Sequence, residues 1–183
     1  MEHRKSTYHA LKAWFFVGEE CLLIDFDKML DCIPAGLSNY IGVPVIRGNQ
    51  AAPAPPYPYA TFNLTTPAGA NGGTWQQHED GIDRLMVESI WSFSTLSTDW
   101  HESMILASRA REWFGHTGRT YLSDHGITVQ STTQINNRDN ILSLEYERKN
   151  GFDVVFYVFD EAENPIAETG YITTANIEHK TTF

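Results

Sequence analysis

The stretch RLMVESIWSFSTLSTDWHESMILASRAREWF, residues 84–114, decides the fold. It contains a strand-like alternation of apolar residues followed by a helix-like apolar pattern, and residues typical of a helix start separate the two. In residues 84–96 apolar and polar side chains alternate, as in a strand with one buried face. The apolar face carries Leu85, Val87, Trp91 and Phe93, and the other carries Glu88, Ser92 and Ser94.

A helix is expected directly after this strand. Asp99, followed three residues later by Glu102, is typical of an N-cap and its reciprocal partner. The helix is expected to reach about Phe114, where Gly115 to Gly118 ends it. Its apolar arc comprises Trp100, Met104, Leu106, Ala107, Ala110, Trp113 and Phe114. The stretch therefore predicts a helix lying on a sheet.

Upstream of this stretch, residues 19–33 show the 3.6-residue period of a first helix, which Pro34 and Gly36 are expected to stop. Residues 42–58 lack periodicity and hold five of the eight prolines, so they predict a stiff, extended arm or loop. Residues 59–66 then read as a strand, and 67–73 as a loop or hairpin tip.

Downstream, four further strands are predicted, at 128–135, 141–148, 152–159 and 171–177. Residues 136–140 are expected to form the turn between the first two strands, and Lys149, Asn150 and Gly151 a tight hairpin turn. The strand at 152–159 is apolar on both faces, so it is either central in the sheet or covered by another subunit.

These elements predict an α+β fold, a mostly antiparallel sheet with two main helices packed on one face. With 183 residues, the chain suits one domain, here residues 19–183 after an amino-terminal extension of residues 1–18.

The charge balance argues against tight nucleic-acid binding. The chain has 13 basic and 23 acidic residues, a formal net charge of −10, which opposes the counterion release that drives such binding. Cys21 and Cys32 lie about 16 Å apart if both are on one helix, so they are expected to stay reduced. The apolar patch at 13–17 is too short for a secretory signal or membrane span, which favours the cytoplasm.

No catalytic, cofactor or metal site is predicted, and the chain is not expected to be an enzyme. His101 and Glu102 lack the second histidine of a zinc-protease helix, since position 105 is Ile105. Gly69, Gly72 and Gly73 lack the lysine of a phosphate loop. The run His78, Glu79, Asp80, Asp83 lacks an EF-hand pattern, and Trp75, Trp91, Trp100 and Trp113 are assigned mostly to core packing.

Two ordered segments resemble the neck or tail terminator family of tailed bacteriophages. The first comprises Val45, Ile46, Arg47, Asn49, Gln50, Pro53, Pro55, Pro58 and Tyr59, and the second Glu145, Tyr146, Glu147, Arg148, Gly151, Phe152 and Asp153. The similarity spans roughly residues 20–159, with the aromatic strand and the helix ending in Trp113 and Phe114 between the two segments.

The resemblance implies a tail-terminator-like fold and a non-enzymatic subunit of a virion. The expected protein forms a hexameric ring that stops growth of the tail tube and joins it to the neck. Implied partners are other copies of the chain, the tail tube protein, a neck or connector protein and the sheath protein of a contractile tail, while DNA passes through without specific binding. The virion tail and neck is the implied location, after assembly in the host cytoplasm.

Contacts with a neighbouring subunit or with the neck are expected at nine residues: Arg47, Asn49, Gln50, Pro53, Pro55, Pro58, Tyr59, Glu147 and Arg148. Glu147 and Arg148 are also candidates for a hairpin ion pair. Two alternatives remain open: another phage ring component, either a head-tail connector or a tube subunit, and a small binding module or hydrolase that uses His78 and Asp80 in the loop 75–83.

Overall fold

The chain folds around one six-stranded sheet, with the strand order β1-β2-β3-β6-β4 and with β5 also paired to β6. The computed structural model describes residues 24–69, 73–78, 81–139 and 147–163. The strands are β1 (Val45–Arg47), β2 (Tyr59–Gly69), β3 (Ile82–Ser97), β4 (Thr128–Thr132), β5 (Asn136–Asn137) and β6 (Arg148–Glu163). Only the β1–β2 pair is parallel among these described strands. The predicted α+β class is confirmed.

The centre of the sheet is the antiparallel pair β3–β6, in register from Ile82 opposite Glu163 to Ser97 opposite Arg148. The strand predicted at 84–96 is therefore confirmed and slightly longer. The strand predicted at 152–159 is also confirmed, and it is central, because β6 lies between β3 and β4.

The predicted hairpin turn at 149–151 is wrong, because these residues lie inside β6 and pair with β3. Asn150 is buried, and its side-chain amide donates to the hydroxyl of Ser103 at 3.1 Å. A Cβ atom at Gly151 would lie 2.6 Å from the carbonyl oxygen of Phe93. Asn150 and Gly151 are therefore not turn residues here. Asn150 makes a buried polar contact, and Gly151 allows the backbones of β3 and β6 to approach closely.

The remaining strands differ from prediction mainly in length. β4 ends at Thr132 rather than at residue 135. The turn predicted at 136–140 is wrong at its start, because Asn136 and Asn137 pair with Gly151 and Asn150 of β6. β2 continues to Gly69, into the predicted loop at 67–73. Residues 140–146 and 171–177, which contain most of one predicted strand and all of another, lie outside the described residues.

The first helix, α1, spans Phe26–Ile41, so its predicted end before Pro34 is wrong. Asp25 caps its start by accepting from the backbone N–H of Lys28 at 2.9 Å. Pro34 removes one helical hydrogen bond, but Ile33, Leu37 and Ile41 bury their side chains almost completely around it. The helix ends at Gly42, whose φ of 79° is the left-handed conformation of a C-cap.

The second helix, α2, spans Trp100–Glu112, and its predicted N-cap is confirmed. The carboxylate of Asp99 accepts from the backbone N–H groups of His101 and Glu102, both at 3.3 Å. Glu102 reaches back to the hydroxyl of Ser97, which in turn accepts from the backbone N–H of Asp99 at 3.0 Å. The reciprocal arrangement of a capping box is thus completed through Ser97.

Two predictions about this region are wrong. Trp100 is 47% exposed rather than on the buried arc, because Ser103, Leu106, Ala107 and Ala110 carry the buried side of α2. Gly115 and Gly118 do not end the helical part of the chain. It continues after α2 as a π-helical turn, Trp113–Thr117, which leads into α3 (Arg119–Asp124).

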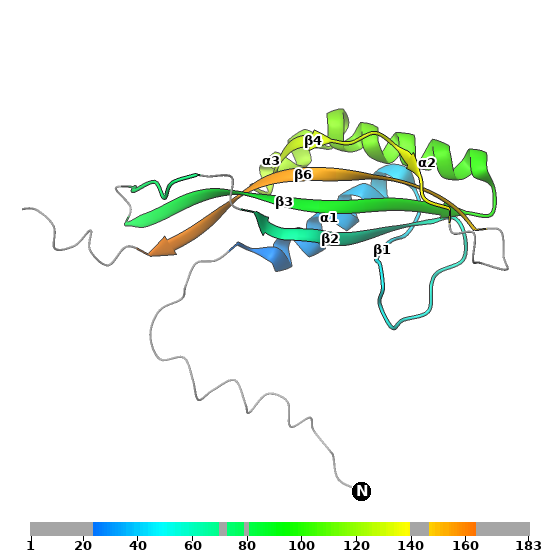
Figure 1. Cartoon of the computed structure of the whole chain (residues 1–183), viewed down its shortest axis with the longest axis horizontal. Coiled ribbons are helices and arrows are strands. Elements are labelled where there is room, and N and C mark those ends of the chain that lie inside the picture. Colours follow the sequence, from blue (N-terminus) through cyan, green and yellow to red (C-terminus); the bar gives the residue numbers. More distant parts are fainter. Residues whose placement is uncertain (1–23, 70–72, 79–80, 140–146, 164–183) are drawn as a thin grey trace, which may run out of the picture.

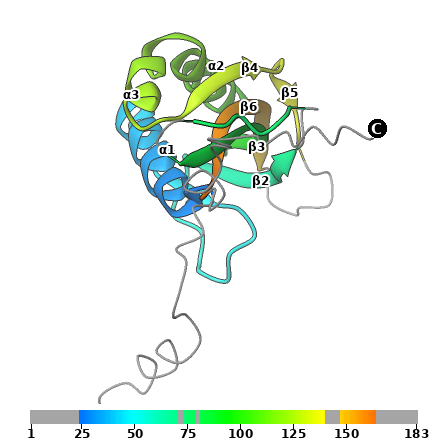
Figure 2. The ribbon, with the colours of Figure 1, turned by 90° about the vertical axis from the view of Figure 1, so that its left-hand side faces the viewer.

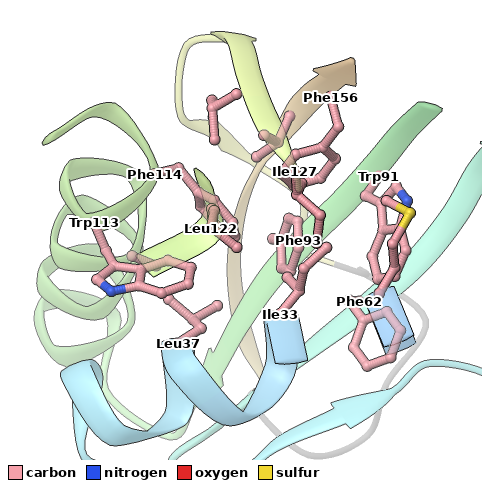
Figure 3. Packing of buried hydrophobic residues seen from close by; sticks show 14 of the residues in the cluster. Ile33, Leu37, Phe62, Trp91, Phe93, Trp113, Phe114, Leu122, Ile127 and Phe156 are labelled. Carbon is pink, nitrogen blue, oxygen red and sulfur yellow. The ribbon is translucent and has the colours of Figure 1, made fainter. Parts of the chain in front are cut away.

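The core lies between the sheet and the helices, all of which cover the same face of the sheet (Figure 2). Aromatic rings of β3 and β6 pack there against the ring of Phe114, and Phe62 of β2 packs on the rings of β3 (Figure 3). Phe93 lies 4.7 Å from Phe114, and Trp91 stacks on Phe62 at 5.3 Å, measured between ring centroids. This cluster fixes the sheet against its helices. No helix of the described residues covers the opposite face of the sheet, which is called the open face below.

The π-helical turn allows a matched stability test. A Cβ atom at Gly118 would lie 2.3 Å from the buried ring of Trp113, whereas one at Gly115 would meet nothing within 4 Å. We predict that Gly118→Ala lowers the free energy of unfolding by about 1–3 kcal/mol through overpacking. Gly115→Ala, the control, should change it by less than about 1 kcal/mol, with urea denaturation as the measurement. Equal losses would contradict the packing assigned to Trp113.

Candidate subunit interface

The loop at residues 48–58 leaves the sheet between β1 and β2 and projects away from the body of the molecule (Figure 1). At its start the backbone N–H of Gly48 donates to the carbonyl of Phe62 at 2.7 Å. A Cβ atom at Gly48 would lie 2.4 Å from the side-chain oxygen of Asn63, so a glycine suits this close approach. Asn49 follows with a φ of 57°, which turns the chain outward.

The start of the loop borders an open cleft of about 390 Å³. Its lining residues are Arg47, Gly48, Asn49, Gln50, Asn63 and Leu64. Arg47, Asn49 and Gln50 are exposed, so a guanidinium and two side-chain amides lie on one accessible surface. This lining suits hydrogen bonding to a polar or acidic partner surface.

The end of the loop is held by a second set of contacts. Tyr57 stacks on Tyr59 with ring centroids 5.4 Å apart, and its hydroxyl donates to the carboxylate of Glu147 at 2.8 Å. Tyr59 is buried, and that burial, together with the charge of Glu147, raises the pKa of its phenol. The peptide bond between Tyr57 and Pro58 is cis. The loop is therefore anchored at both ends.

The nine candidate residues thus fall into separate groups. Arg47, Asn49 and Gln50 lie at the cleft, Pro53 and Pro55 lie within the loop, and Pro58, Tyr59 and Glu147 lie at the second anchor. Arg148 forms its ion pair with Asp139, at 3.1 Å. Although burial opposes ionisation of Asp139, hydrogen bonds from Lys149 N–H, Arg148 and Asn137 hold its pKa below the usual value.

Two partners of the candidate residues were missed from the sequence, Tyr57 and Asn63. The contact of Tyr57 was not predicted, because Tyr57 lies between two prolines and its partner Glu147 lies 90 residues further along the chain. Asn63 faces Gly48 only because β1 pairs with β2 in parallel. No local pattern marks either contact, because both depend on the sheet topology.

Arg138, which no sequence pattern marked, organises the polar half of the open sheet face. Its guanidinium donates to the hydroxyl of Ser92 at 2.6 Å and to the carboxylate of Asp153 at 2.9 Å, and it reaches the hydroxyl of Ser94 at 3.3 Å. Burial works against ionisation of Asp153, but hydrogen bonds from Ser92 and Arg138, with the charge of Arg138, lower its pKa.

The loop proposed for metal or substrate binding is only partly described. Trp75 and His78 are exposed, and the backbone of Gln76 pairs with Arg84, while Glu79 and Asp80 lie outside the described residues. Within the described ranges no three His, Cys, Asp or Glu side chains gather as a metal site would require. Those ranges also contain no helix long and apolar enough to cross a membrane.

A family model described as phage neck terminator protein matches residues 31–182. The chain belongs to this family. A search of curated proteins found no match. The matched range contains the loop at 48–58 and the anchor at Glu147, while residues 1–30 lie before it. The resemblance seen in the sequence is therefore confirmed.

Membership makes this neck terminator a structural protein of the phage virion, with its place in the tail and neck. Such a protein associates with other tail and neck proteins.

The ion pair on the open face gives a pH-dependent prediction. Asp153→Asn should lower the free energy of unfolding at pH 7 by about 1 kcal/mol, a modest value because the carboxylate is 38% exposed and screened by solvent. Since the folded-state pKa of Asp153 is lowered, its contribution is present above its ordinary pKa and disappears as pH falls through the folded-state value.

The difference between wild type and Asp153→Asn should therefore shrink below about pH 4, as measured by urea denaturation at a series of pH values. Asp31→Asn, at an exposed carboxylate of α1, is the control and should cost less at pH 7. A loss that stays constant from pH 7 to pH 3 would contradict the ion-pair origin.

Proposed function

We propose that this neck terminator forms a ring of identical subunits, a hexamer, that ends the tail tube and joins it to the neck. The observation that carries the proposal is the projecting loop at 48–58, which is anchored at both ends and exposed between them. This loop belongs to a chain of the neck terminator family. In the ring, this loop contacts the neighbouring subunit or the neck.

The loop is suited to a permanent contact because its conformational entropy is already reduced. Proline fixes its own φ, and the loop holds Pro53, Pro55 and Pro56 between the anchors at Gly48 and Tyr57, with Pro58 directly after the second anchor. A segment that is stiff before binding loses less entropy when it docks. Exposed Arg47, Asn49 and Gln50 then add directional hydrogen bonds beside the loop.

The charge of the chain supports passage of DNA through such a ring. A net charge of −10 repels phosphate and leaves a passing duplex without strong attachment points. The proposed partners are the tail tube protein on one side of the ring and a neck or connector protein on the other, with the sheath protein added in a contractile tail. Assembly is proposed to take place in the host cytoplasm.

Replacing residues 50–56 with a Gly/Ser linker of equal length tests this function, because it removes the stiff segment and keeps both anchors. A phage carrying the variant should make soluble subunit but few joined particles, with abnormally long tail tubes in electron micrographs. The yield of infectious particles should fall at least about tenfold, the factor that corresponds to about 1.4 kcal/mol per contact.

Ile105→Ala, at an exposed apolar position of α2, is the matched control and should leave tail length and yield unchanged. Thermal melting of both variants verifies that they fold. Normal tails from the linker variant would contradict the role of the loop. Labelled subunits seen along the tube would instead identify the chain as a tube subunit. Labelled subunits within the head portal would identify it as a head-tail connector.

A further inference from the structure

The open sheet face has an apolar half at the end where β3 begins and β6 finishes. Met86 and Phe159 lie directly opposite each other in the β3–β6 register and are 46% and 54% exposed. Tyr157 is half-buried next along β6, and β4 pairs with β6 only as far as this residue. Beyond Tyr157, β6 has only β3 beside it in the described part of the chain. Exposed apolar rings on an uncovered strand edge invite association.

The first described residue of the chain lies at this same end. A cavity of about 210 Å³ is lined by Ile24 and Met29 on one side and by Val158, Phe159 and Glu161 of β6 on another. Residues before Ile24 therefore join the fold beside Phe159. β6, the last described element, also ends at this end of the sheet, at Glu163. Either terminal segment is close enough to reach the apolar half.

The surroundings of this surface are strongly acidic. Residues 24–31, 82–88 and 157–163 contain eight acidic side chains against two basic ones, Lys28 and Arg84. The rest of the described chain balances seven acidic against seven basic side chains, so the net negative charge of the described residues gathers at this one end. The acidic side chains are Asp25, Asp27, Asp31, Asp83, Glu88, Asp160, Glu161 and Glu163.

The charge selects between the two terminal segments. Residues 1–18 carry Arg4, Lys5 and Lys12 with one acidic residue, Glu2, and end in the apolar run Trp14 to Val17, whereas Glu19 and Glu20 lie between this segment and Ile24. Residues 164–183 carry two acidic residues and one lysine, which leaves them negative. A basic segment with an apolar run complements an acidic surface with exposed apolar side chains.

Chain length favours docking within one molecule. Trp14 precedes Ile24 by ten residues, which reach up to about 33 Å when extended. Such a short tether gives the segment a high effective concentration at its own surface, on the order of millimolar. This segment lies before the range that the family model matches, which starts at residue 31.

We propose that residues 1–18 dock on the surface formed by Met86, Tyr157, Phe159 and the adjoining cavity of their own chain. The run Trp14 to Val17 covers the exposed apolar side chains, and the basic residues lie against the acidic groups around them. The docked segment covers an association-prone strand edge in the single subunit, a role separate from ring formation by the loop at 48–58.

A photo-crosslinking amino acid in place of Phe159, in the full chain, tests the docking. Because Phe159 is more than half exposed, an aromatic analogue fits there, and Met86 is a second position for the same probe. Cross-links to peptides within residues 12–18 are expected by mass spectrometry. The same probe at Ile105, 44% exposed on α2, should give none to that segment.

Mixing unlabelled with 15N-labelled chains tests whether the contact is internal, because cross-linked peptides should then carry a single isotope. The triple change Arg4→Glu, Lys5→Glu, Lys12→Glu should lower the yield at least about threefold at low salt, and the difference should narrow at 1 M salt. Cross-links to residues 164–183, isotopically mixed products, or equal yields from positions 159 and 105 would overturn the proposal. An unchanged yield from the charge-reversed chain would do the same.

Discussion

The continuous pairing of β3 with β6 is the constraint on which the rest of the structure depends. Side chains on a strand alternate between faces, so the register that places Phe93 opposite Phe152 also places Met86 opposite Phe159 on the other face. A slip by one residue would exchange the two faces of β6. The aromatic core, the ion pair of Arg138 with Asp153 and the apolar half of the open face all follow from this one register.

The β1–β2 edge of the sheet and the far end of the β3–β6 pair place the two proposed association surfaces away from the core. On one side, the parallel pair β1–β2 holds both ends of the loop at 48–58, with Gly48 against Asn63 and Tyr57 against Glu147. At the other end, β3 and β6 extend as a pair past the end of β4, beside the start of α1. Both proposed association surfaces therefore occupy positions where substitutions leave the aromatic cluster intact.

The features predicted correctly from the sequence are those with a local cause. Alternation identified β3, because every second residue from Leu85 to Phe93 faces the core, and all of these are apolar except the small, fully buried Ser89. The cap at Asp99 was predicted because its contacts span only two and three residues. Pro34, Asn150 and Gly151 were misjudged because distant packing decides their conformation: the apolar face of α1 for the proline and the β3 backbone for the other two. The candidate interface was predicted as residues but not as an arrangement, since its contacts join segments up to 90 residues apart.

The pairing of β6 with β3 also sets the order in which the subunit is completed during synthesis. β6 is made after every other described element, yet it lies between β3 and β4 at the centre of the sheet. Until it emerges from the ribosome, the core faces of β3 and β4 lack their shared neighbour, and contacts between distant segments form slowly. A nascent chain that stops before residue 148 has no central strand, so truncated products lack the fold that a ring would incorporate.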